Sequence, residues 1–84
     1  MPGETAPVPT PRYTKILAAS EQIAHGMGHS HVGVEHLFLA ILRDPHAVPT
    51  QVAAQVINVD SLDNRLIELM NSRGYRTPGS DVVA

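Results

Sequence analysis

The hydrophobic residues of this chain recur at helical spacing. Between residues 11 and 27 they follow one another at intervals of three and four, which lays one stripe along a helix. The stripe consists of Tyr13, Ile16, Leu17, Ser20, Ile23, Ala24 and Met27. We expect this helix over residues 11–26, with Thr10 as its N-cap and Pro11 in the first position, where a missing N–H costs nothing.

A second helix is predicted from about Gly33 to Arg43, in "GVEHLFLAILR". After Glu35 and His36 this segment is apolar on nearly every side, which indicates a helix that neighbouring elements bury on most faces. The glycines of the preceding "HGMG" separate it from the first helix, because glycine readily adopts the left-handed conformation that closes a helix.

Two further helices complete the expected architecture. Residues 48–57 suit a helix if Pro49 lies in its first turn, although the β-branched residues would also suit a strand. The segment "NVDSLDNRLIELMNSRG" has a leucine stripe, with Asp60 or Ser61 as the expected cap and Gly74 as the expected end. The pattern predicts an all-α, compact domain of four (to five) short helices, without an internal repeat or a second domain.

The two ends of the chain differ from this helical middle. Prolines crowd the start, so we expect a flexible tail over residues 1–9, and residues 75–84 read as a second tail. The domain then comprises residues 10–74. The full chain of 84 residues has 43% hydrophobic residues and no cysteine, so a small core must hold the fold without disulfides. Self-association is a natural source of further stability for a domain of this size.

Charge and motifs exclude several classes of function. The net charge is −2 and the basic residues are scattered, so no stripe exists for nucleic-acid phosphates. The longest apolar run, Leu37 to Leu42, is too short for a bilayer, and the start lacks the features of a secretory signal, so we expect no membrane partner and a cytoplasmic location. No phosphate loop or nucleophile motif is present. We expect no enzyme, no catalytic residue and no cofactor.

Four of the five histidines gather in "HGMGHSHVGVEH", residues 25–36. Zinc needs three or four converging ligands, and the pair His25 and His29 converges only if a helix continues through Gly26 and Gly28. These glycines argue against such a helix, and the spacing matches no recognised zinc signature. We therefore predict no metal site. The alternative is a metal- or ligand-responsive helical protein that uses the turn from His25 to His36.

The stretch "PTPRYTKILAASEQIAHGMGHSHVGVEHLFLAILRDP" resembles one repeat of the Clp N-terminal domain, which is found on Clp-type AAA+ unfoldases. The resemblance covers about residues 9–73. It rests on Thr10-Pro11-Arg12, Gly28-His29, Val32-Gly33, Glu35-His36, Leu37 to Leu42 and Arg43-Asp44. It implies an all-α platform that docks adaptor proteins and substrates without catalysis. The family's usual domain has two four-helix repeats in pseudo-twofold symmetry, and this chain holds one.

The resemblance also implies where ligands bind. In some family members the glutamate of a G-T-E-H motif recognises phosphorylated arginine, and Glu35 holds that position here. A carboxylate can accept paired N–H bonds from a guanidinium. Glu35 has a second possible role, which is to favour the first turn of its helix by meeting the positive end of the dipole. Val34 stands where the family usually has threonine, so a hydroxyl that could bond a phosphate is missing.

Arg12 and Tyr13 complete the predicted ligand- and peptide-binding residues. An aromatic residue that often precedes T-P-R contributes to a peptide- and antibiotic-binding face in some members, and Pro9 replaces it here. Tyr13 is the nearest aromatic, and packing at the first helix is its other possible role. The turn-structural residues are predicted to be Gly28, His29, Gly33 and His36, of which both histidines match family positions that hold no metal.

These features predict a non-catalytic protein-interaction module. We expect it to bind Clp substrates, adaptors or Clp-directed compounds, and to modulate Clp proteolysis or sequester its components. One repeat exposes the apolar surface that a second repeat would cover, so a C2 homodimer is expected. Pairing with the N-domain of a Clp ATPase is the competing arrangement.

Overall fold

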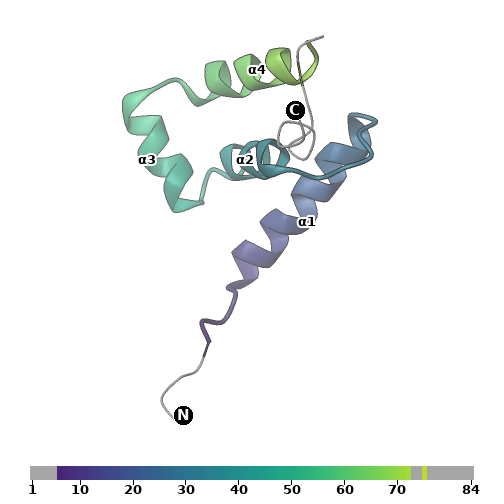
Figure 1. The fold of residues 1–84 in the computed structure, drawn as a ribbon. Coiled ribbons are helices and arrows are strands. Elements are labelled where there is room, and N and C mark those ends of the chain that lie inside the picture. The colour runs from purple at the N-terminus through teal and green to yellow at the C-terminus, as the bar shows by residue number, and fades with distance from the viewer. Residues whose placement is uncertain (1–5, 73–74, 76–84) are drawn as a thin grey trace.

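The computed structural model describes residues 6–72 and residue 75, and within them it contains four helices and no strand. The helices are α1 (Pro11–Gly26), α2 (Val34–Leu42), α3 (Val48–Val56) and α4 (Val59–Met70). Figure 1 shows α2 in the middle, and α2 contacts each of the other three helices. The all-α prediction is confirmed.

Both ends of α1 follow from local chemistry. The Thr10 side chain accepts the backbone N–H of Tyr13 at 3.1 Å, and Pro11 stands in the first turn. At the other end the backbone N–H of His29 reaches Ala24 O at 3.0 Å, and Gly28 adopts a φ of 76°. This is a Schellman motif, which requires a left-handed residue that glycine supplies without steric cost. The turn sends the chain back toward α2.

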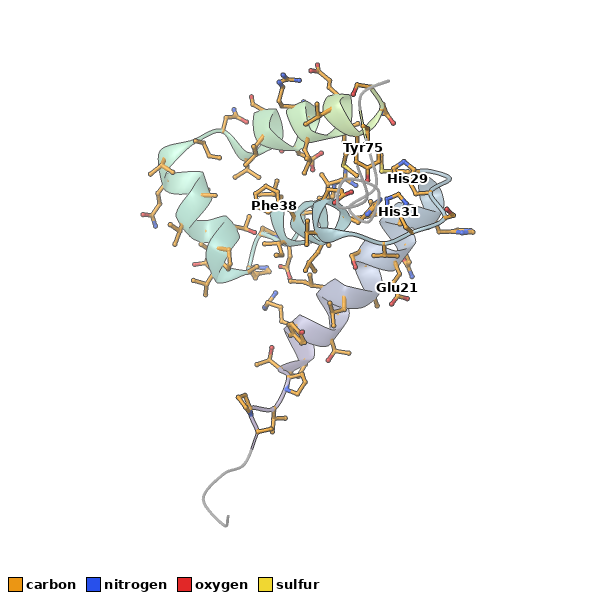
Figure 2. All side chains as sticks on the ribbon, viewed as in Figure 1. Glu21, His29, His31, Phe38 and Tyr75 are labelled. Carbon is orange, nitrogen blue, oxygen red and sulfur yellow. The ribbon has the colours of Figure 1, made fainter. Side chains whose placement is uncertain are left out.

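The core is centred on α2. Leu39 and His36 are the largest side chains with no exposed surface. The other buried residues come from all four helices and the α2–α3 connection, namely Ala24, Ala40, Leu42, Ala47 and Met70, with the polar Ser20 and Thr50. One side of α2 remains open, because Phe38 is 42% exposed (Figure 2). The pattern indicates burial on most faces, and Phe38 and the first residue of the helix, Val34, depart from it.

Polar contacts fasten α3 and α4 to the carboxyl end of α2. The Thr50 hydroxyl donates to the carbonyl oxygen of Ile41. Arg43 binds Asp63 of α4 with two parallel bonds, Nε to Oδ2 at 2.8 Å and Nη2 to Oδ1 at 3.0 Å. Pro49 lies in the first turn of α3, where its missing N–H removes no helical bond. The strand alternative for this segment is wrong.

The predicted ends of α4 need correction. Asn58, rather than Asp60 or Ser61, caps the helix, and its Oδ1 accepts the Ser61 N–H at 3.0 Å. Asparagine is as good a cap as aspartate or serine. The earlier start places Val59 inside the helix, where it lines a groove with residues of α2 and α3. The helix ends at Met70, and Gly74 lies outside the described residues.

The predicted tails are described only in part. Residues 6–9 are exposed and have no regular structure, while residues 1–5 and 76–84 lie outside the described part of the chain. Tyr75, the first residue of the expected C-terminal tail, is described and lies against the histidines (Figure 2). Across the described ranges, no helix has the length and apolar character needed to cross a membrane.

Candidate functional site

Glu35 occupies the first turn of α2, where Gly33 makes room for its side chain. The φ of Gly33 is −122°, a backbone conformation that any residue can adopt. A Cβ at this position would nevertheless lie 2.9 Å from Glu35 Oε1. The Glu35 side chain is only 13% exposed. Gly33 therefore matters sterically, because its lack of a side chain lets the carboxylate fold back against the start of the helix.

Tyr75 is the main hydrogen-bond partner of this carboxylate, although it is 40 positions away in the chain. Its phenolic O–H donates to Glu35 Oε2. The His31 Nε2 lies 3.0 Å from the same phenolic oxygen and 3.9 Å from Glu35 Oε2. Since the phenol proton goes to the carboxylate, the phenol oxygen accepts from His31 Nε2–H. The sequence pattern had indicated no role for His31 or Tyr75.

The protonation states of the pair follow from its surroundings. Burial opposes ionisation of Glu35, but the bonds from Tyr75 and from a backbone N–H, together with His36 and His31, lower its pKa below the usual value. Burial, followed by the bond to Glu35 and its negative charge, raises the pKa of Tyr75 to about 12. At neutral pH the pair is a carboxylate that accepts and a phenol that donates.

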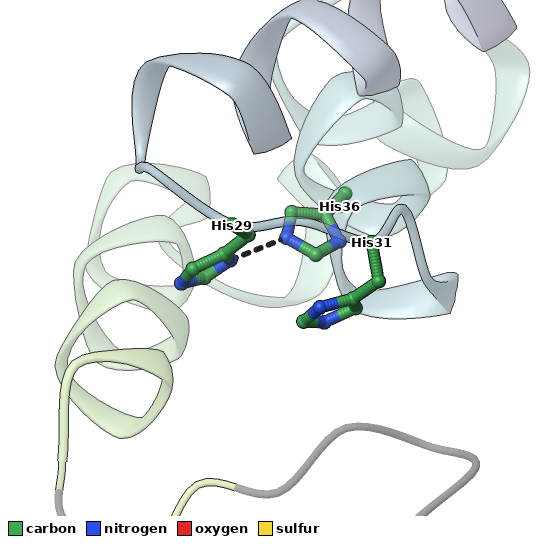
Figure 3. Close-up of side chains that lie close together, drawn as sticks. All are labelled: His29, His31 and His36. Atoms are coloured by element: carbon green, nitrogen blue, oxygen red, sulfur yellow. Dashed lines mark hydrogen bonds between the residues drawn. The ribbon is translucent and has the colours of Figure 1, made fainter.

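Three histidines lie beside this pair. His29, His31 and His36 each place one ring nitrogen within 4.8 Å of the others (Figure 3). The rings of His29 and His31 are stacked, with centroids 5.3 Å apart and an interplanar angle of 8°. His36 stands across both rings, at 75° and 73°. The pair considered and rejected from the sequence, His25 and His29, is not brought together here, because His25 is not part of this group.

The position of the proton on His36 can be assigned from its partners. The Gly33 N–H can only donate, so His36 Nδ1 accepts it at 2.9 Å, as a Glu or Gln does in a capping box. Neutral His36 then has its proton on Nε2, which donates to His29 Nδ1 at 2.8 Å. Burial above all lowers the pKa of His36, with nearby Glu35 opposing and the other two histidines reinforcing this shift.

This assignment bears on metal binding. A nitrogen that carries a proton has no free lone pair for a metal, and ligating histidines normally donate, rather than accept, through their second nitrogen. In this arrangement His36 Nε2 is therefore not a ligand. The absence of a metal site stays a prediction, which the hydrogen bonds of His36 support.

Arg12 and Tyr13 lie at the amino end of α1, about 20 Å along the helix from its carboxyl end, which leads into the histidine turn. Arg12 Nη1 contacts both carboxylate oxygens of Asp44, at 2.9 and 2.7 Å. Tyr13 is 54% exposed. Both residues line a groove of about 320 Å³ that continues to Leu37, Ile41, Ala47 and Val48. The residues predicted to bind ligands therefore occupy two separate places.

Val34 lies next to Glu35 but points to a different surface. It is 74% exposed and lines a shallow groove with Leu17, Val32 and Leu37. Leu37 is common to this groove and to the one beside Tyr13. An apolar face thus runs along α1 and α2 from Val34 to Val48, and it is distinct from the Glu35 site.

The family model described as the Clp repeat (R) N-terminal domain matches residues 2–73, which include all four helices, Glu35 and the three histidines. The chain belongs to this family. The resemblance noted in the sequence is therefore confirmed, and the four helices of this Clp repeat carry the Glu35 site at one end of α2.

Relatives of this Clp repeat include much longer proteins. Chaperone protein ClpB of Oceanobacillus iheyensis is 30% identical over 64 residues, which are 75% of this chain and 8% of that protein. The negative regulator of genetic competence ClpC/MecB of Bacillus subtilis gives the same identity and coverage. The chloroplastic chaperone protein ClpC of Pisum sativum is 34% identical over 61 residues, 60% of this chain and 7% of that protein.

The chain thus spans less than a tenth of the length of these relatives. No solved structure gives a significant match to this Clp repeat.

Proposed function

We propose that this Clp repeat is a non-catalytic protein-interaction module that binds a cationic side chain of a partner at Glu35. Family membership supports an interaction role, since the relatives are named as chaperones and as regulatory or ATP-binding parts of the Clp system. Binding of Clp substrates or adaptors would let the module modulate or sequester traffic to a Clp protease.

The observation that carries this proposal is the state of the Glu35 carboxylate. It is ionised, largely buried and fixed at the amino end of α2. Among the described residues its only ion-pair partner is His31, at 3.9 Å. No arginine or lysine of the described ranges neutralises it. A carboxylate in such surroundings is a strong acceptor for a charged donor, because partial burial weakens the screening by water.

An arginine side chain fits this acceptor better than other cations. Its planar guanidinium can present two parallel N–H groups to one carboxylate and can stack on the neighbouring imidazoles. Val34 offers no hydroxyl for a phosphate. We therefore propose an unmodified arginine, rather than phosphoarginine, as the side chain that Glu35 receives.

A peptide titration tests this function. The probes are a blocked Gly-Gly-Arg-Gly-Gly peptide and its lysine counterpart, with binding followed by NMR. Glu35→Gln keeps the size of the side chain but removes its charge, and we expect it to weaken arginine binding at least tenfold. Glu68→Gln is the matched control, because Glu68 is an exposed carboxylate on α4. Equal affinity of the wild type and Glu35→Gln would refute the proposal.

We further propose that two copies pair through the apolar face. Tyr13 and Val34 lie on it, and Val48 at its end is 68% exposed. Exposed apolar patches of this kind mark interaction sites in small proteins, and a C2 pair would cover the same patch on both copies. Sedimentation that shows only monomer at high micromolar concentration would exclude the homodimer and leave pairing with a Clp ATPase N-domain.

A further inference from the structure

The Glu35 site already contains a side chain that behaves like a ligand. The Tyr75 hydroxyl bonds the carboxylate, and its ring stacks beside His29, with centroids 5.5 Å apart and an interplanar angle of 21°. It also lies near His31, at 6.1 Å and 24°. These distances are typical of offset aromatic stacking. Tyr75 thus combines a planar ring with a hydrogen-bond donor.

A guanidinium would need the same two contacts. It is planar, it donates to carboxylates and it stacks on aromatic rings. The Tyr75 hydroxyl bonds Oε2, which is one of the two oxygens that a paired guanidinium would use. Tyr75 and an incoming arginine therefore cannot both occupy the carboxylate in these positions.

The place of Tyr75 in the chain suits a side chain that a ligand can displace from Glu35. Tyr75 lies five positions after Met70, the last residue of α4, and is not part of any helix. Its backbone N–H bonds Ser72 O at 3.2 Å, and its side chain has hydrogen bonds with Glu35 and His31 and stacks beside His29 and His31. Release of the side chain leaves the hydrogen bonds of α2 and the cap at His36 intact.

We infer that Tyr75 is an internal ligand of the Glu35 site, which an arginine side chain of a partner must displace in order to bind. This inference rests on the proposed function, and it adds an internal competitor for the incoming arginine. Lysine can replace the hydrogen bond but not the stacking, because its ammonium is not planar. The site therefore prefers arginine to lysine.

The competition has a measurable size. When only a fraction of the protein is free to bind, the apparent dissociation constant increases by the inverse of that fraction. A hydrogen bond to a charged group is among the stronger ones in proteins, and a tenfold bias toward the occupied state is modest for such a bond. Tyr75→Phe removes the hydroxyl and keeps the ring, so we expect about tenfold tighter binding of arginine.

The experiment compares three proteins with the blocked Gly-Gly-Arg-Gly-Gly peptide and its lysine counterpart. Wild type, Tyr75→Phe and Ser61→Ala are titrated by NMR through the backbone amide of Glu35. Ser61→Ala is the control for hydroxyl loss, because Ser61 is exposed near the start of α4. We expect Tyr75→Phe to bind the arginine peptide about tenfold more tightly than the other two proteins, and each protein to prefer arginine to lysine.

The outcomes separate this inference from the proposed function. Measurable and equal affinities of wild type and Tyr75→Phe would overturn the inference while arginine binding at Glu35 stands. No binding by either protein would refute arginine recognition itself, and the inference with it. A second measurement needs only the wild type: Overhauser contacts between the Tyr75 and His31 rings should disappear as the arginine peptide saturates the site. Contacts that persist at saturation would also overturn the inference.

Discussion

Replacement of His36 by alanine should cost about 3–5 kcal/mol of the free energy of unfolding. His36 has no exposed surface and makes two hydrogen bonds, one from the Gly33 N–H and one to His29. Each bond contributes about 1 kcal/mol, and the cavity left by a buried ring adds about 2 kcal/mol. Because small domains have about 5–15 kcal/mol in total, the variant should be close to unfolding.

A matched substitution separates the cap from the cavity. Glutamine at position 36 can accept the Gly33 N–H as in a capping box, so His36→Gln should recover roughly half of the loss. His46→Ala is the control, because His46 is an exposed histidine, and it should change stability by less than about 0.5 kcal/mol. Urea denaturation followed by circular dichroism measures all three. A loss below about 1 kcal/mol in His36→Ala, or glutamine no better than alanine, would refute the assigned role of His36.

Three further predictions concern protons, metal and ion pairs. The fold holds the pKa of His36 below the value of about 6.5 that it has in an unfolded chain, so the unfolded chain binds more protons in acid. The free energy of unfolding should therefore be greatest above about pH 6.5 and decrease as the pH falls below it. A decrease as the pH rises would contradict the lowered pKa of His36. Zinc in tenfold excess, or a chelator, should leave the melting temperature unchanged within about 1 °C, whereas a clear rise with zinc would show that His36 can release its Nε2 proton. Arg43→Ala should lose about 1 kcal/mol by breaking the paired bonds to Asp63, while Arg65→Ala, whose ion pair is more exposed, should lose almost nothing; equal losses in thermal melts would contradict this ranking.

The helices were predictable because their signals are local. Thr10 and Pro11 begin α1 through contacts within one turn, and Gly28, with its positive φ, closes the other end of the helix. Asn58 was missed as a cap because three of the four residues from 58 to 61, namely Asn58, Asp60 and Ser61, all suit the role. The structure decides between them, because the Asn58 side chain accepts the Ser61 N–H and the helix already begins at Val59.

The site was less predictable, because it is built from contacts across the chain. Glu35 was singled out by its family motif, but neither periodicity nor composition connects it to a residue 40 positions away. The gathering of His29, His31 and His36 depends on the tight reversal at Gly28, and helical spacing alone could suggest only His25 with His29. An aromatic residue beside glycine in an expected tail gives no signal of docking until the fold brings the carboxylate to it.

The position at which an arginine peptide binds decides whether Glu35 is its receptor. Chemical-shift changes in the backbone spectrum of the Tyr75→Phe protein, recorded with the blocked Gly-Gly-Arg-Gly-Gly peptide, locate that position without assuming it. We predict that the largest changes fall on His31, Gly33 and Glu35, around the amino end of α2. Changes confined to the groove beside Tyr13 and Val48, with the amide of Glu35 unmoved at saturation, would refute arginine recognition by Glu35.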